Sequence, residues 1–277
     1  MKKALSILMA VIMLCMMAFP AFAEEAEQKT YEERVAALKT NYSVTFGKAR
    51  DPETWTVAQR DVSIRCVEEA VALLGSRAMH TVASYWINAK GRFDIYAGMN
   101  TKSVRGIAYH ENGQICFSIP LLEGPYVFYN EGERYEWAIT KKDAEESIMT
   151  QRRAIVHEIG HAYDDELLKQ EGARAMAAIN GPYSGSPYGG GWENYASPQG
   201  GQDASEDFAT MFAFMLTSEQ LISELEVPRE NGGLRKRNSD DVFWKKCEAI
   251  YELMLRDFGV DSNAVKRAAW FLGKEEN

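Results

Sequence analysis

The sequence contains few of the residues that cross-link small exported domains. Only four cysteines occur among 277 residues, and the first of them, Cys15, lies in an N-terminal apolar run. The other three, Cys66, Cys116 and Cys247, are too few for a disulfide scaffold, and an odd number cannot pair completely. We therefore expect a fold held together by an apolar core, in which these cysteines are small buried thiols.

Positive charge is also in short supply. The chain has 31 Lys and Arg residues against 40 Asp and Glu residues, which gives a formal net charge of -9 at pH 7. Nucleic acids and anionic lipid surfaces attract basic proteins. This charge balance therefore argues against both as partners.

Long apolar runs are absent after residue 19. The single run, residues 4–19, follows the basic Lys2 and Lys3 and precedes Pro20-Ala21-Phe22-Ala23, a small-x-small cleavage pattern. The run is too short for a membrane span and is typical of a secretory signal peptide over residues 1–23. We expect a secreted protein with no membrane anchor in its mature form.

Histidine is as rare as cysteine, yet two of the four histidines fall four positions apart in His157-Glu158-Ile159-Gly160-His161. On an α-helix this spacing places both imidazoles on one face, where they can bind one ion. Neutral imidazoles suit zinc, and a catalytic zinc needs one more protein ligand and an open position for water. Glu158 can accept a proton from that water. At ordinary residue frequencies the pattern arises by chance in roughly one chain in a hundred of this length.

The surroundings of this motif predict a helix over residues 144–169. Apolar residues on its other side would hold the helix in the core, and Gly160 allows another element to approach closely. Asp164 and Asp165 follow His161, and a metal-bound histidine usually donates its second N–H to a carboxylate or carbonyl. Asp164, three residues after His161, is on the ligand face; the alternative is that both acids are solvated charges.

A second helix is predicted after residue 202, with Asp203 or Ser205 as its cap. Its apolar residues are spaced to form one face: Phe208, Met211, Phe212 and Met215. Glu206 lies in the first turn, where the helix terminus favours a carboxylate. Glu206 is the best candidate for the third zinc ligand, and Asp207, about 100° further around the helix, is the alternative. The alternative is that both acids have no ligand role, because acidic residues are common in the first turn of any helix.

Residues 181–202, between these two helices, are rich in glycine, proline and tyrosine. Such a long segment without regular structure is typical of a functional loop or of a flexible linker. Its place between two ligand-bearing helices favours a wall or lid over the cleft.

Upstream, residues 105–118 predict a β-hairpin around Asn112-Gly113, a dipeptide that takes the positive φ values of tight turns. An edge strand placed before a metal helix can pair with an extended peptide and present its scissile carbonyl. Gly106, Ile107 and Ala108 are the candidates for this substrate edge. The alternative is an ordinary hairpin without a ligand.

The rest of the chain predicts scaffold elements. These are a helix over residues 53–74 that ends at Gly75, strands at 42–46 and 92–96, a loop or short strand pair at 126–137, a helix starting at Ser218, and helices at 240–258 and 262–271.

Two stretches resemble a known family. His157-Glu-Ile-Gly-His-Ala-Tyr-Asp-Asp165 is similar to the active helix of the anthrax lethal factor-like metalloendopeptidases, which include the secreted Pro-Pro endopeptidases. Glu206-Asp-Phe-Ala-Thr-Met-Phe212 resembles the helix that carries their third ligand. The resemblance implies a gluzincin with zinc held by His157, His161 and Glu206, and with Glu158 as general base.

The resemblance also implies a tyrosine that hydrogen-bonds the oxyanion, about two turns before the ligand glutamate. That offset falls on Gln199, so Tyr195, four residues earlier, is the candidate. Family members usually carry an acidic residue four positions after the ligand, and here that position is Thr210. Metzincins are excluded because the glycine and third histidine that they need are replaced by Asp164 and Leu167.

Together these features predict an α+β, zincin-like fold, with a small mixed sheet whose edge strand packs on the His-Glu-x-x-His helix and a mainly helical C-terminal lobe. We expect a signal peptide at 1–23, an α/β part at 24–140 and a helical zinc-binding part at 141–277, in one compact monomeric unit. The expected function is a secreted zinc metalloendopeptidase acting on peptides or proteins. The alternatives are a zinc-binding secreted protein with impaired catalysis and a zinc hydrolase of cell-wall amides.

Overall fold

The fold comes from a computed structural model, which describes residues 30–42, 44–46, 56–90, 94–98, 108–111, 114–118, 121–130, 133–180, 183, 185, 194–228 and 234–274. Contacts divide the chain into two units, Met1–Arg34 and Val35–Asn277. The expected signal peptide and Cys15 lie outside the described residues. Within those residues, no helix has both the length and the apolar character needed to cross a membrane.

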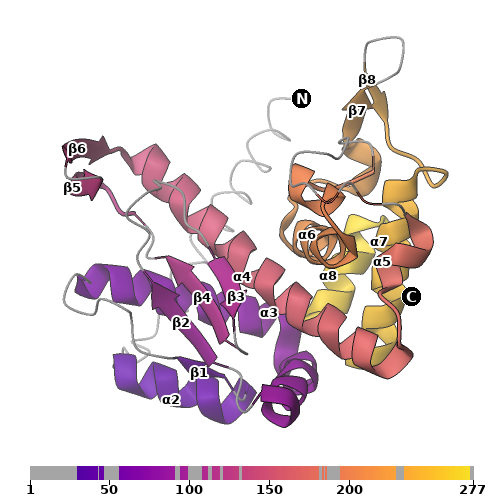
Figure 1. The fold of residues 1–277 in the computed structure, drawn as a ribbon, viewed down its shortest axis with the longest axis horizontal. Helices are drawn as coiled ribbons and strands as arrows, with labels where there is room; N and C mark the ends of the chain where they lie inside the picture. The colour runs from indigo at the N-terminus through magenta and orange to yellow at the C-terminus, as the bar shows by residue number, and fades with distance from the viewer. Residues whose placement is uncertain are drawn as a thin grey trace, which may run out of the picture. The chain divides into compact units, whose positions relative to one another are not determined.

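Helix α4, Lys141–Glu171, carries the His-Glu-x-x-His motif (Figure 1). It starts three residues before the predicted position because Thr140 and Asp143 form a capping box, in which each side chain accepts a hydrogen bond from the other's backbone N–H. It ends at Gly172, whose φ of 74° is the left-handed conformation that glycine adopts without strain. The predicted helix is thus confirmed and slightly extended.

Helix α3, Val57–Lys90, packs along α4. Its buried face includes Ile64, Val67 and Leu74, as the apolar spacing predicted. Gly75 has φ 83° and ψ 165° and interrupts the helix, but the chain resumes a helical path to Lys90. The predicted end of the first helix at Gly75 is therefore confirmed, and a second helical stretch follows it across a kink.

A four-stranded mixed sheet lies on α4 (Figure 1). Its order is β1-β2-β4-β3, made of β1 Thr45–Phe46, β2 Asp94–Gly98, β3 Ala108–Glu111 and β4 Gln114–Ser118. The pairs β1–β2 and β2–β4 are parallel and β3–β4 is antiparallel. The predicted hairpin is confirmed as β3–β4, and both of its strands contact α4. Among the described strands, β3 lies at one edge of this sheet and β1 at the other.

A second hairpin, β5 Gly124–Asn130 with β6 Glu133–Ile139, precedes α4. For residues 126–137, where the sequence predicted either a loop or a short strand pair, the structure has the strand pair. Ile139 at the end of β6 packs with Leu121 and Ala144, and the Leu121 N–H donates to Ser147 Oγ of α4 at 3.0 Å. These contacts fix the start of the metal-motif helix.

The chain after α4 is mainly helical. Its elements are α5 Ala175–Ile179, the 3₁₀ helix η3 Pro198–Gly201, α6 Ala204–Thr217, the 3₁₀ helix η4 Ile222–Glu224, β7 Glu226–Pro228, β8 Leu234–Lys236, α7 Val242–Phe258 and α8 Asn263–Phe271. The helix predicted from Ser218 is wrong. Ser218 takes extended dihedrals as the C-cap of α6, and the β7–β8 hairpin follows where a helix was expected.

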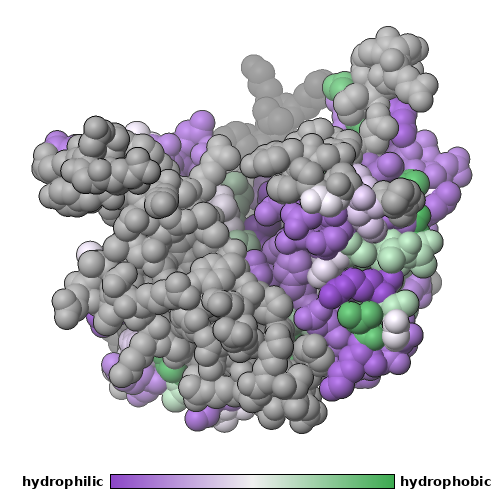
Figure 2. Space-filling model, viewed as in Figure 1, coloured by the Kyte–Doolittle hydropathy of each residue, from purple (hydrophilic) through white to green (hydrophobic). Residues whose placement is uncertain are grey.

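Helix α6 contacts α4, α7 and α8, and aromatic side chains fill the space between them. The Tyr163 ring lies 5.7 Å from Phe208, 6.0 Å from Phe212 and 4.7 Å from Phe258, and the Tyr163 hydroxyl donates to Asp257 at 2.8 Å. Cys66 and Cys247 are free and buried, as expected. The described residues on the face seen in Figure 2 are mostly hydrophilic, with small separate apolar groups.

Candidate metal centre

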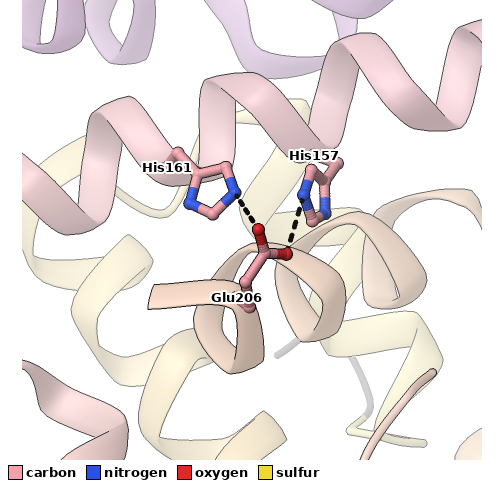
Figure 3. Close-up of side chains that lie close together, drawn as sticks. All are labelled: His157, His161 and Glu206. Carbon is pink, nitrogen blue, oxygen red and sulfur yellow. Dashed lines mark ion pairs between the residues drawn. The ribbon is translucent and has the colours of Figure 1, made fainter. Parts of the chain in front are cut away.

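Two histidines of α4 and one glutamate of α6 point toward a common centre (Figure 3). The Nε2 atom of His157 lies 3.4 Å from Glu206 Oε2, and the Nε2 atom of His161 lies 3.5 Å from Glu206 Oε1. One ligand atom from each residue falls within 4.8 Å of the other two. All three side chains are partly buried.

These distances fit a tetrahedral zinc site. With Zn–N and Zn–O bonds of about 2.0–2.2 Å, neighbouring ligand atoms are separated by about 3.4 Å. Glu206 Oε2 is buried and accepts no hydrogen bond from the residues that the structure describes, so it retains a lone pair for an ion. Three protein ligands of this kind leave a fourth position open. The three residues form a candidate metal centre.

The charge state of Glu206 also suits a metal ligand. Burial alone would raise the pKa of its carboxyl, but the contacts with His157 and His161 lower that pKa to about 2. Glu206 is therefore ionised throughout the physiological pH range. Burial alone would lower the pKa of His161, and the contact with Glu206 together with the charge of Glu158 raises it overall.

Close packing of the two helices brings Glu206 to the histidines. A Cβ atom built on Gly160 would lie 3.1 Å from Ala209 Cα and 3.1 Å from a Phe212 ring carbon. The prediction that Gly160 permits a close approach is confirmed. Because Ala209 is three residues after Glu206, this contact fixes the distance between the ligand and α4.

The cap of α6 sets the rotation of its first turn. Asp203 Oδ1 accepts from the N–H groups of Ser205 and Glu206, each at 2.9 Å. Asp203, rather than Ser205, is therefore the cap. Ser205 is then available for another contact: its Oγ lies 3.0 Å from His161 Nδ1.

Ser205 belongs to a polar group behind His161. Arg174 donates to Ser205 Oγ at 3.1 Å, to Asp165 at 2.9 Å and to Asp164. Asp164 is fully buried. Ser205, and not the predicted Asp164, therefore contacts the imidazole directly. Asp164 is connected to Ser205 through Arg174. From the sequence, Ser205 was only a possible helix cap, because only the fold brings its hydroxyl beside His161.

Asp207, the alternative ligand, is directed away from the histidines. Its Oδ2 atom lies 2.7 Å from Lys246 Nζ on α7 and accepts from the Tyr183 hydroxyl at 2.8 Å. The structure therefore brings Glu206, and not Asp207, to the imidazoles.

Glu158 and His157 line a cavity of about 290 Å³ next to the candidate metal centre. Glu158 is only 5% exposed. Burial raises the pKa of its carboxyl, and the charges of His157 and His161 offset part of that rise. The other residues that line the cavity come from α4, from the segment before α6 and from α6 itself: Thr150, Arg153, Ala154, Ala196, Ser197, Gln199, Thr210, Ala213 and Phe214.

Tyr195, the predicted oxyanion residue, is buried beside this cavity wall. Lys246 Nζ lies 4.2 Å from the centre of its ring, and the Tyr183 ring is 6.3 Å away. Among the described residues that line the cavity, Gln199 is present and Tyr195 is not. The role of Tyr195 stays a prediction.

Thr210 occupies the position where the family resemblance predicts an acid. Its hydroxyl donates to the Glu206 carbonyl at 2.7 Å, within α6. The nearest buried acid on the same helix is Asp207, one turn earlier. Of the predicted substrate edge, Gly106 and Ile107 lie outside the described residues, and Ala108 begins β3 opposite Phe117.

No protein-family model matches the chain, and no curated protein matches it significantly. Among solved structures, the chain is similar to a crystal structure from Bacteroides caccae ATCC 43185 described as a candidate zinc-binding metallo-peptidase. The alignment covers 90% of this chain and 95% of that chain, with 16% sequence identity and a TM-score of 0.44.

Proposed function

We propose that the chain is a secreted zinc metalloendopeptidase of the gluzincin type with a zincin-like fold. The observation that carries the proposal is the convergence of His157, His161 and Glu206 beside a cavity that contains the buried Glu158. Two imidazoles and a carboxylate are a ligand set of catalytic zinc sites, and the adjacent acid is the group that such sites use to move protons.

The residues divide the chemistry among them. His157, His161 and Glu206 would hold the ion, which supplies Lewis-acid activation of water and of the scissile carbonyl when bound. Glu158 accepts the proton of the attacking water and passes it to the leaving amine. Its burial supports this role, since a raised pKa makes a carboxylate a better base near neutral pH.

Strand β3 supports a peptide as the substrate class. This edge strand of the described sheet packs on α4, the helix that carries both histidines. An extended peptide added to such an edge runs alongside the strand and presents its backbone carbonyls at regular intervals. In our proposal, Gly106, Ile107 and Ala108 hold the peptide by backbone hydrogen bonds, and Tyr195 stabilises the oxyanion. The active form would be a monomer.

A second candidate function is a secreted zinc-binding protein with impaired catalysis. The specific observation is the buried position of Tyr195, whose ring lies against Lys246 rather than among the described residues of the cavity. Stoichiometric zinc without turnover of any peptide would support this alternative. Turnover of cell-wall amides instead of peptides would point to a different zinc hydrolase.

The test is a metal and cleavage assay on the mature chain with a matched pair of variants. Glu158→Gln removes the proposed base and keeps the shape of the side chain, and Glu145→Gln changes an exposed glutamate of the same helix. We expect one zinc per chain in all three proteins, cleavage of a peptide library by the wild type and E145Q, and loss of cleavage in E158Q. Cleavage by E158Q at the wild-type rate would refute the mechanism.

A further inference from the structure

A lysine is buried next to the candidate metal centre without a role in the chemistry above. Lys246, on α7, has a side chain that is 0% exposed, and its Nζ lies 2.7 Å from Asp207 Oδ2, which is also 0% exposed. Lysine is almost never fully buried unless its charge is paired. Asp207 directly follows Glu206, so this ion pair connects α7 to the first turn of the ligand helix.

The same ammonium group holds a second segment. Lys246 Nζ donates to the Asn194 carbonyl at 2.7 Å and lies 4.2 Å from the centre of the Tyr195 ring. Residues 196, 197 and 199 then line the cavity beside Glu158. We call residues 194–199 the wall segment. One buried charge thus contacts α6, next to Glu206, and the start of the wall segment.

Gly200, the residue that directly follows the wall segment, packs closely against α6. A Cβ atom on Gly200 would lie 2.8 Å from Thr210 Oγ1 and 3.4 Å from the Tyr195 side chain. The Tyr183 hydroxyl is a second partner of the Asp207 carboxylate, at 2.8 Å. The wall is therefore fixed by an electrostatic contact at one end and by close packing directly after its other end.

We propose that Lys246 is a positioning residue, which sets the wall segment and Tyr195 relative to Glu206 and Glu158. This inference rests on the proposed function for its catalytic consequence. A buried ion pair adds little stability compared with an apolar pair of similar size, because both charges lose their hydration. The Lys246–Asp207 pair instead fixes one geometry of three segments, including the carbonyl of Asn194, which an apolar side chain cannot bind.

The test needs a variant that folds. Replacing Lys246 alone leaves Asp207 buried without its partner, so the informative protein is the double variant Lys246→Met with Asp207→Asn, in which neither position carries a charge. The matched control is Lys245→Met, because Lys245 is the exposed neighbour on the same helix. Circular dichroism and zinc content establish that each protein is folded and loaded.

The first readout is hydrogen exchange, which requires no catalytic activity. The amides of Gly200 and Gln202 donate to the carbonyls of Ser197 and Gln199, at 3.1 Å and 2.9 Å, and report on the wall. In the double variant we expect both amides to exchange at least about 10-fold faster. The Lys246 contact is absent there, so the free energy needed to open this segment locally is lower. The Gly259 amide at the end of α7 is the internal reference and should exchange at the wild-type rate.

The second readout is peptide hydrolysis. A misplaced wall should lower kcat by about 10- to 100-fold with a smaller change in KM, since positioning acts in the transition state. Unchanged exchange at Gly200 and Gln202, or wild-type kcat despite faster exchange, would overturn the inference. If the wild type itself hydrolyses no peptide, the proposed function fails, and faster exchange in the double variant still establishes that Lys246 fixes the wall.

Discussion

The Nδ1 atom of His161 lies 3.0 Å from Ser205 Oγ, so the residue directly before Glu206 contacts the imidazole that faces Glu206. When Nε2 of a histidine binds a metal, Nδ1 carries the proton and donates it to a partner. Ser205 is in turn held by Arg174. One turn of α6 therefore supplies both a candidate ligand and the group that orients another.

Ser205→Ala should weaken zinc binding. Loss of such an outer partner typically lowers metal affinity by about 10- to 100-fold, because the imidazole is no longer held in one orientation. Competition with a chelator measures the affinity, and Ser239→Ala, at an exposed position, is the control. Equal affinities of S205A and the wild type would show that the contact with His161 is incidental.

Gly160→Ala should separate α4 from α6. The added methyl group would lie 3.1 Å from Ala209 Cα, and a backbone atom cannot move aside without the helix. Overpacking of this kind costs about 1–3 kcal/mol in the free energy of unfolding. We expect that loss in chemical denaturation together with weaker zinc binding, because Glu206 moves with Ala209. Normal stability and normal zinc affinity would mean that the helices separate freely here.

Acid should release zinc through the histidines rather than through Glu206. The contacts of His161 with Glu206 and the charge of Glu158 raise the pKa of His161 above 6.5 in the metal-free protein. Protons therefore compete with zinc as the pH falls through that raised pKa, whereas Glu206, with a pKa of about 2, stays ionised. Zinc affinity measured across mildly acidic pH should fall steeply. A constant affinity down to pH values near 4.5, the ordinary pKa of glutamate, would contradict this assignment.

Asp241 should contribute acid-sensitive stability. Its carboxylate accepts from Arg235 at 2.9 Å and 2.6 Å, and although burial opposes the shift, these contacts lower its pKa below the ordinary 3.8. A lowered folded-state pKa stabilises the fold at pH values above 3.8, and that stability is lost as the pH falls through the folded-state pKa. Asp241→Asn should lower the melting temperature at neutral pH and have little effect in strong acid.

The control for that prediction is Asp240→Asn, at the exposed neighbouring position. D240N should melt close to the wild type at both pH values. An identical effect of D241N at neutral and at strongly acidic pH would mean that the charge of Asp241 is not what stabilises this turn.

Structural features that depend on residues close together in the sequence were predictable. The spacing of apolar residues gives α4 and α6, the four-residue interval of His157 and His161 gives their common face, and Asn112-Gly113 gives the β3–β4 hairpin. Each depends on residues within about one or two turns of each other.

Features that depend on distant contacts were not predictable. Ser205 meets Arg174 and Lys246 meets Asn194 only after the helices pack, and a buried lysine looks in sequence like any charge on an amphipathic helix. Ser218 shows the limit of a local signal. Serine is typical of helix starts, yet Ser218 is the C-cap of α6.

The most direct test of the central claim compares two neighbouring carboxylates, of which only Glu206 faces the imidazoles. Glu206→Gln removes the candidate ligand, and the double variant Asp207→Asn with Lys246→Met removes the neighbouring charge together with its buried partner. In zinc titrations we expect one tight site in the wild type, a loss of more than about 100-fold in affinity for E206Q, beyond that of an outer partner, and a bound zinc in the double variant. Wild-type affinity in E206Q, or a chain that binds no zinc at all, would contradict the account.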